Sequence, residues 1–216
     1  MIKKINYIII YIFLSLSGCL KDNINEPVNA ELGSSARLLH YLEEQGDYIN
    51  SPEAPSLINA DEVYSNLSNY LIIDVRTKEE FINGHIATAK NISNTELLNY
   101  LLANDPGSYL KIVIVSANGH ASAYYSCLLR LYGFNNVYSM NFGMAYWNID
   151  FSDEWMQKIG NSENISDYNN NNYPKGNFTK LPEVFERSGK PVSRLAKERI
   201  AFLIVRGFVD KMDNIN

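Results

Sequence analysis

Two short runs of aliphatic residues constrain the fold of this chain more than any other feature of its sequence. Residues 71–75 (LIIDV) and 112–115 (IVIV) are almost continuously apolar and rich in β-branched side chains. Such runs are typical of strands that are covered on both faces, as in a parallel sheet. Residues 96–103, between the two runs, and residues 121–132, after the second, have a helical period. This alternation predicts an α/β domain with a parallel sheet flanked by helices.

The composition fits one globular domain with extensions. The chain has 216 residues, of which 46% are hydrophobic and 20% are charged, and these values lie inside the globular range. Nineteen basic residues against 24 acidic residues give a formal charge of −5. Binding to nucleic acid through phosphates needs clustered positive charge, and no Lys/Arg-rich run follows residue 4. We therefore expect no nucleic-acid partner.

The N-terminus has the features of a secretion signal. After a basic start, residues 5–16 form an apolar run of about a dozen residues, shorter than the roughly 20 that span a bilayer as a helix. The run ends in the sequence LSGC, which resembles the bacterial lipobox. The resemblance implies that residues 1–18 are a lipoprotein signal peptide and that Cys19 is lipidated. We therefore expect a protein of the bacterial cell envelope, lipid-anchored to a membrane through Cys19.

Composition also divides the rest of the chain. The expected segments are a tether over 19–30, a helical extension over 31–54 with a helix at 31–44, the α/β domain over 55–155, an Asn-rich linker over 156–180 and a C-terminal helical segment over 181–216. Apolar residues after Pro191 share one helix face, so we expect this helix to dock on the domain. In the alternative, its apolar part at 200–205 stays exposed and binds a protein partner.

Several short motifs in the central segment resemble the signature of rhodanese-like domains, in order and in spacing. They are Asp74-Val75-Arg76, Glu80-Phe81, Gly84-His85-Ile86, Ala89, Asn91-Ile92, Gly133-Phe134-Asn135-Asn136-Val137-Tyr138, and Gly143 with Trp147. The sequence departs from the family at Thr88 and Phe142, where the family usually has glycine. The resemblance implies a rhodanese-like parallel sheet flanked by helices, with N- and C-terminal helical extensions.

The polar signature residues have mainly structural roles in this interpretation. In the family, the aspartate and arginine at Asp74 and Arg76 end a strand, the glutamate at Glu80 lies in a short helix, and the pair Gly84-His85 turns the chain. His40 has no second His or Cys at ligand spacing. We therefore expect no metal site and no cofactor.

The loop after residues 112–115 decides the expected function. In active rhodaneses this loop begins with cysteine and runs C-x-x-G-x-R-S into a helix, whose N-terminus and backbone N–H groups stabilise a sulfur anion. Here the loop consists of Ser116, Ala117, Asn118, Gly119, His120, Ala121 and Ser122. Serine thus occupies the nucleophile position, and a hydroxyl oxygen neither ionises near pH 7 nor carries a transferable sulfur. We expect a catalytically inactive binding or scaffolding module whose loop suits a small oxyanion such as sulfate or phosphate.

Two enzymatic alternatives stay open. A sulfurtransferase could use another thiol, and Cys127 is the candidate, although we expect it to be buried on the apolar face of its helix. A hydrolase could use Ser116 as the nucleophile, His120 as the base and Asp74 as the orienting carboxylate, because loops at the carboxyl ends of parallel strands lie close together.

Overall fold

The computed structural model describes residues 33–44, 56–157, 174, 181 and 191–208. The signal peptide expected at 1–18, Cys19, the tether expected at 19–30 and almost all of the linker expected at 156–180 lie outside these ranges. The described residues from Ser34 onward belong to one compact unit. Among the described helices, none has the length and apolar character needed to cross a membrane.

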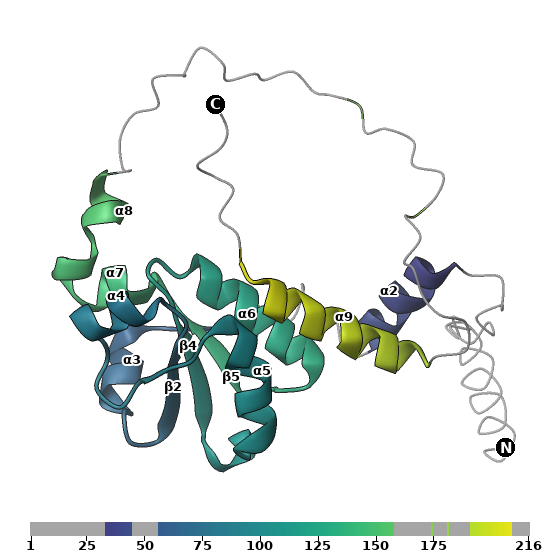
Figure 1. Cartoon of the computed structure of the whole chain (residues 1–216), viewed down its shortest axis with the longest axis horizontal. Helices are drawn as coiled ribbons and strands as arrows, with labels where there is room; N and C mark the ends of the chain where they lie inside the picture. The colour runs from purple at the N-terminus through teal and green to yellow at the C-terminus, as the bar shows by residue number, and fades with distance from the viewer. Residues whose placement is uncertain (1–32, 45–55, 158–173, 175–180, 182–190, 209–216) are drawn as a thin grey trace, which may run out of the picture. The chain divides into compact units, whose positions relative to one another are not determined.

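A five-stranded parallel sheet forms the centre of the domain (Figure 1). Its order is β1 (Leu57–Ile58), β5 (Val137–Met140), β4 (Lys111–Val115), β2 (Tyr70–Asp74) and β3 (Lys90–Asn91). All five residues of β2 and the last four of β4 are buried. This burial on both faces is the reason why their sequences do not alternate. The predicted α/β class is confirmed, with both strands beginning one residue earlier than predicted.

Helices cover both faces of this sheet. On one face, α5 (Asn94–Ala103) and α6 (His120–Tyr132) pack their leucines against Ile73 of β2 and Ile114 of β4. On the other face, α3 (Ala60–Ser65) and α7 (Gly143–Trp147) pack against Ile72 and Val113. The remaining short elements are α4 (Lys78–Asn83), η1 (Pro106–Ser108), η2 (Ile149–Phe151) and α8 (Asp153–Gln157).

The C-terminal extension adds a helix to the first face. The helix predicted after Pro191 is α9 (Val192–Arg206), and its Ile200 and Ile204 are buried in the core with residues of α5 and α6. Phe202 and Val205 on the same helix are exposed. The helix therefore docks within the chain and leaves only part of its apolar segment in contact with solvent.

Side chains of α5 and α6 fix the C-terminal end of α9. Asn94 donates from Nδ2 to the carbonyl of Val205 at 2.8 Å, and the Tyr124 hydroxyl donates to the carbonyl of Leu203 at 3.0 Å. The Leu203 carbonyl also accepts the N–H of Gly207, so these side chains add to the capping of the helix end. The N-terminal extension supplies α2 (Ser34–Glu44), which contacts α9.

Candidate functional site

The candidate site lies at the carboxyl end of β4, beside β2 at the centre of the sheet. The chain leaves β2 toward β3 on one side, whereas β4 pairs with β2 on the other side. In open α/β sheets, ligands bind where the strand order reverses in this way. The loop from Ser116 to Gly119 leaves β4 at this position and leads into α6.

Ser116 is buried under its own loop, with 3% of its surface exposed. Its Oγ accepts hydrogen bonds from the N–H groups of Gly119 at 3.1 Å and Ser122 at 3.2 Å. It donates its proton to Ser122 Oγ at 3.2 Å. A hydroxyl has one proton and two lone pairs, so all three hydrogen-bonding positions of Ser116 are used within the loop.

The hydrogen bonds continue from Ser116 into the core. Ser122 Oγ donates to the carbonyl of Gly119 at 2.9 Å, so its contact of 2.8 Å with Ser139 Oγ places the donated proton on Ser139. Both serines are completely buried. Sequence reasoning missed Ser139, because a single serine in strand β5 has no sequence signal that connects it with the loop.

The rest of the loop is held against α7. The carbonyls of Ser116 and Ala117 accept hydrogen bonds of 2.9 Å from the N–H groups of Met144 and Ala145. A Cβ atom on Gly143 would collide with the carbonyl oxygen of Ser116, so this close approach requires glycine. The motif of Gly143 with Trp147 marks this glycine in the sequence but does not indicate its contact with the loop.

Other predicted loop residues also bond or pack locally. The N–H of His120 donates to Asn118 Oδ1 at 3.1 Å. Gly119 has φ +93°, a left-handed conformation that glycine adopts without steric cost. Ala121 packs against the core shared by α5, α6 and α9. The N–H groups of residues 119, 120 and 122, which an oxyanion would need, thus have acceptors inside the loop.

Asp74 and Arg76 form a buried ion pair at the end of β2. Arg76 Nη2 lies 2.7 Å from Asp74 Oδ2, and Arg76 Nε lies 3.0 Å from Oδ1. The same guanidinium donates to the carbonyl of Gly84 at 2.8 Å and so holds the turn after α4. The carboxylate of Asp74 is therefore engaged by a cation of its own loop.

Glu80 and His85 stabilise the short helix α4. Glu80 Oε2 accepts hydrogen bonds from the backbone N–H and the hydroxyl of Thr77 at 2.9 and 2.6 Å, which completes a capping box. His85 donates from Nδ1 to the backbone carbonyl of Phe81 at 2.8 Å, and its imidazole stacks on the Phe81 ring. These contacts fix the loops beside the site.

The geometry does not assemble a Ser116–His120–Asp74 triad. The proton of Ser116 is directed at Ser122, and Asp74 is paired with Arg76. His120 is exposed at the first position of α6, with its ring edge-on to Trp155 at 6.3 Å.

The prediction that Cys127 is buried was wrong. Cys127 is exposed, because α6 packs Tyr125 and Leu129 into the core and Cys127 lies on the opposite side of the helix. Sequence spacing placed it with Leu128 and Leu131, but α6 turns that side chain to solvent. Partial desolvation still raises the pKa of the Cys127 thiol above its ordinary value.

Both positions that depart from the expected glycines have left-handed backbone conformations. Thr88 has φ +72° and Phe142 has φ +56°. A residue with a side chain adopts such angles at a cost of about 1–2 kcal/mol, whereas glycine adopts them without that cost. The structure therefore gives a physical reason for glycine at these positions.

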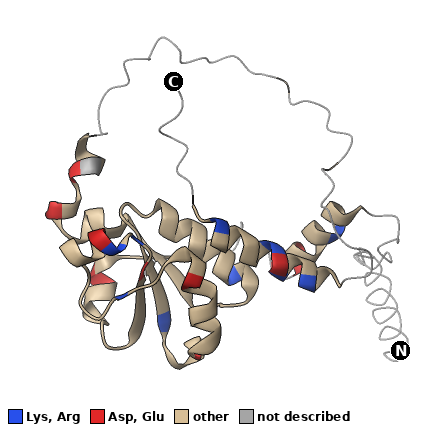
Figure 2. Cartoon of the chain, in the orientation of Figure 1, with Lys and Arg blue, Asp and Glu red and all other residues tan. Residues whose placement is uncertain are grey.

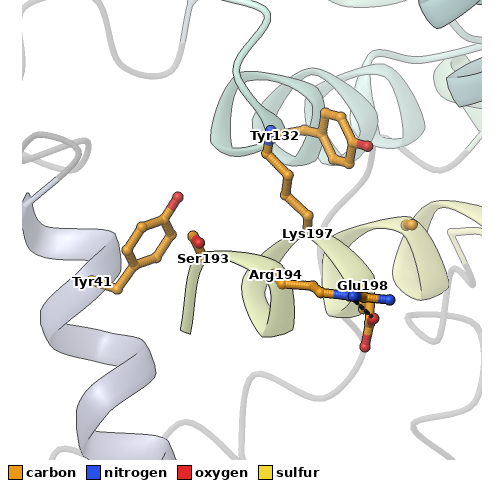
Figure 3. A pocket seen from close by; sticks show the side chains of 7 residues that line it. Tyr41, Tyr132, Ser193, Arg194, Lys197 and Glu198 are labelled. Carbon is orange, nitrogen blue, oxygen red and sulfur yellow. Dashed lines mark hydrogen bonds and ion pairs between the residues drawn. The ribbon is translucent and has the colours of Figure 1, made fainter. Parts of the chain in front are cut away.

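Two concavities lie away from the loop. A cavity of about 600 Å³ lies beside α4 and the start of α5, with Arg76, Phe81 and Asn91 in its lining. Another, of about 430 Å³, lies between α2, α6 and α9 (Figure 3). There Lys197 lies over the ring of Tyr132, and Arg194 pairs with Glu198. Within the described residues, no group of three His, Cys, Asp or Glu side chains could hold a metal ion.

The fold and the loop define a class: a parallel α/β domain whose central strand leads through a tight loop into a helix N-terminus. The model of the rhodanese-like domain family matches residues 59–150. A thiosulfate sulfurtransferase GlpE of Stutzerimonas stutzeri is 31% identical over 77 residues, which cover 36% of this chain and 69% of the relative. The chain therefore belongs to the rhodanese-like family.

Another relative and two solved structures are similar to part of this chain. A thiosulfate sulfurtransferase GlpE of Ectopseudomonas mendocina is 29% identical over 98 residues, 45% of this chain and 86% of the relative. A rhodanese-related protein of Thermoplasma volcanium is 31% identical, with a TM-score of 0.38, over 42% of this chain and 87% of that one. A rhodanese-like domain protein of Staphylococcus aureus is 29% identical, with a TM-score of 0.37, over 43% and 91%.

Proposed function

We propose that this protein is a membrane-anchored lipoprotein whose rhodanese-like domain binds a ligand or a partner and does not transfer sulfur. Relatives of the domain bear the name thiosulfate sulfurtransferase. Sulfur transfer in the family proceeds through a persulfide on a loop cysteine, and we assign the position of that cysteine to Ser116. An alcohol oxygen in this position forms no persulfide.

The observation that supports this proposal most strongly is the complete internal hydrogen bonding of Ser116. Both lone pairs of its Oγ face N–H groups, and its proton is donated to Ser122. An activated serine would instead donate to a base and leave a lone pair for attack. The same bonds argue against a serine hydrolase at this loop.

We assign an oxyanion such as sulfate or phosphate to the start of α6 as the ligand of the loop. The helix N-terminus favours negative charge there. The anion would compete with Asn118 Oδ1 for the N–H of His120, which now donates to that oxygen at 3.1 Å. We therefore expect modest affinity, because each new hydrogen bond replaces an existing one.

A sulfurtransferase assay tests the inactive assignment. The full chain should show no thiosulfate:cyanide sulfurtransferase activity above background. The Ser116→Cys variant should gain activity, because the N–H groups of Gly119 and Ser122 would then face a sulfur and favour the thiolate. Activity in the unaltered chain would overturn the proposal.

A second candidate function is sulfur transfer through Cys127, which its exposure favours. Its raised pKa argues against it, since less thiolate is present near neutral pH. Cys127 also lies about 10 Å along the axis of α6 from the first helical residue. Loss of measured activity in Cys127→Ser would identify this thiol as the nucleophile.

The lipid anchor has its own test. The Cys19→Ser variant should move from the membrane fraction to the soluble fraction, because the acyl chains supply the membrane affinity. If the variant stays in the membrane fraction, Cys19 is not the anchor.

A further inference from the structure

A patch of large apolar side chains is exposed next to the candidate site. It consists of Phe142, Tyr146 and Trp155, and we call it the aromatic patch; Ile149 and Met156 are further exposed apolar residues of the same segment. The ring of Phe142 lies 6.1 Å from those of Tyr146 and Trp155, so the three rings form one group. The exposed fractions of these three residues are 48%, 60% and 36%.

The core does not require these side chains. The same segment has other large residues, and Met144, Trp147 and Phe151 turn inward to pack in the core under α3 and α7. The residues of the aromatic patch face away from that core and are exposed. Contiguous exposed apolar groups of this kind mark interaction surfaces, and Trp and Tyr are enriched among the few residues that carry most of the binding energy at protein interfaces.

The segment that carries the patch is acidic. Asp150 and Asp153 are exposed between its residues, and the segment 142–157 contains no lysine and no arginine. In Figure 2, α8 carries red but no blue among the described residues. The faces of aromatic rings have negative potential, so the rings and the carboxylates attract the same kind of group.

We propose that the aromatic patch is a docking surface for a protein partner that presents a segment with arginine or lysine side chains. The cationic groups lie over Tyr146 and Trp155, and Asp150 and Asp153 pair with the charges at the rim. This surface extends the proposed binding role, but it does not depend on the chemistry of Ser116. Its position beside the loop leaves the serine hydrogen bonds untouched.

Fluorescence anisotropy with a labelled peptide of alternating arginine and glycine tests this proposal on the full chain. We expect saturable binding that weakens as salt is added, and no binding of a matched peptide of glutamate and glycine. Trp155→Ala should weaken binding about fivefold, through loss of a cation–π contact. The double variant Asp150→Asn, Asp153→Asn should also bind more weakly and lose much of the salt dependence.

Phe202→Ala is the matched control, because Phe202 is an exposed ring on α9, outside the patch. It should leave binding unchanged. The proposal is overturned if the arginine peptide does not bind, or if Trp155→Ala binds as well as the unaltered chain. It is also overturned if a chito-oligosaccharide binds through Trp155 and the peptide does not. The sulfurtransferase assay fails or succeeds independently of these results.

Discussion

Substitution of Ser116 by alanine tests the central feature of the site. The hydroxyl of Ser116 is the acceptor for the N–H groups of Gly119 and Ser122 at 3.1 and 3.2 Å. Alanine removes that acceptor without adding bulk. Because residue 116 is buried, water has no ready access to replace it. Two donors at the start of α6 then lose their partners.

The expected cost follows from the number of orphaned groups. A buried polar group left without a partner costs about 1–3 kcal/mol, so two N–H groups lead us to expect a loss of about 3 kcal/mol. For a compact unit of this size, that loss lowers the melting temperature by roughly 6–12 °C. Urea unfolding of the full chain measures the loss as a shift of the midpoint with an unchanged slope.

Two further variants make this measurement specific. Ser108→Ala removes an exposed hydroxyl that donates to the carbonyl of Asp105, and it should cost less than about 0.5 kcal/mol. Ser116→Cys keeps a weak acceptor in place and should cost less than Ser116→Ala. A loss below about 0.5 kcal/mol for Ser116→Ala would refute the reasoning, since the N–H groups would then not depend on the hydroxyl.

Three other variants address the supports of the site. Gly143→Ala should destabilise the chain by about 3 kcal/mol in urea unfolding, because its Cβ meets the carbonyl oxygen of Ser116 and its φ of +55° suits glycine. A hydrogen bond from Lys111 is the main cause that lowers the pKa of Glu62 below its ordinary value of 4.5. The stability that this pair contributes is therefore present above pH 4.5 and is lost as the pH falls through the lowered pKa. Lys111→Met should remove this part of the pH dependence of stability, which is worth less than about 1 kcal/mol at this exposed pair. Ile204→Ala should cost about 3 kcal/mol in the same unfolding assay, because the side chain is completely buried.

Each of these variants has a matched control. Gly133→Ala tests positive φ without a close contact, since a Cβ atom on Gly133 would have no neighbouring atom within 4 Å, and it should cost less than Gly143→Ala. Lys78→Met removes an exposed lysine and should leave the acid limb of the stability curve unchanged. Phe202→Ala should have a small effect beside Ile204→Ala. Equal effects within any pair would contradict the assigned cause.

The central strands and their flanking helices could be predicted from the sequence, because a strand that is buried on both faces consists almost only of apolar residues. The runs that form β2 and β4 contain almost only apolar residues, and the helical period predicts α6 to within one residue. The two-residue strands β1 and β3 are too short to show such an apolar run. They form because a neighbouring strand supplies hydrogen-bond partners, not because of their own composition.

The sequence could not predict how the loop satisfies its own polar groups. That arrangement depends on Ser139, which comes from β5, and on Gly143, which comes from the next helix. It could not predict the exposure of Cys127 either, because which side of α6 is buried depends on packing against the sheet and α9, which come from other parts of the chain. Such contacts depend on tertiary structure and have no local pattern.

In the proposed assignment, a serine takes the place of the family's cysteine and changes the energetic role of the loop. N–H groups that converge on a thiolate stabilise a charge, and that contribution depends on the ionisation of the sulfur. The same groups around Ser116 bind a neutral oxygen that is already fully hydrogen-bonded, so they serve to begin α6 and to fix the loop to β5 through Ser122 and Ser139. An oxyanion at the start of α6 has to displace one of these bonds, whereas groups that already face solvent bind without that cost. Beside this loop, those are the exposed rings of Phe142, Tyr146 and Trp155.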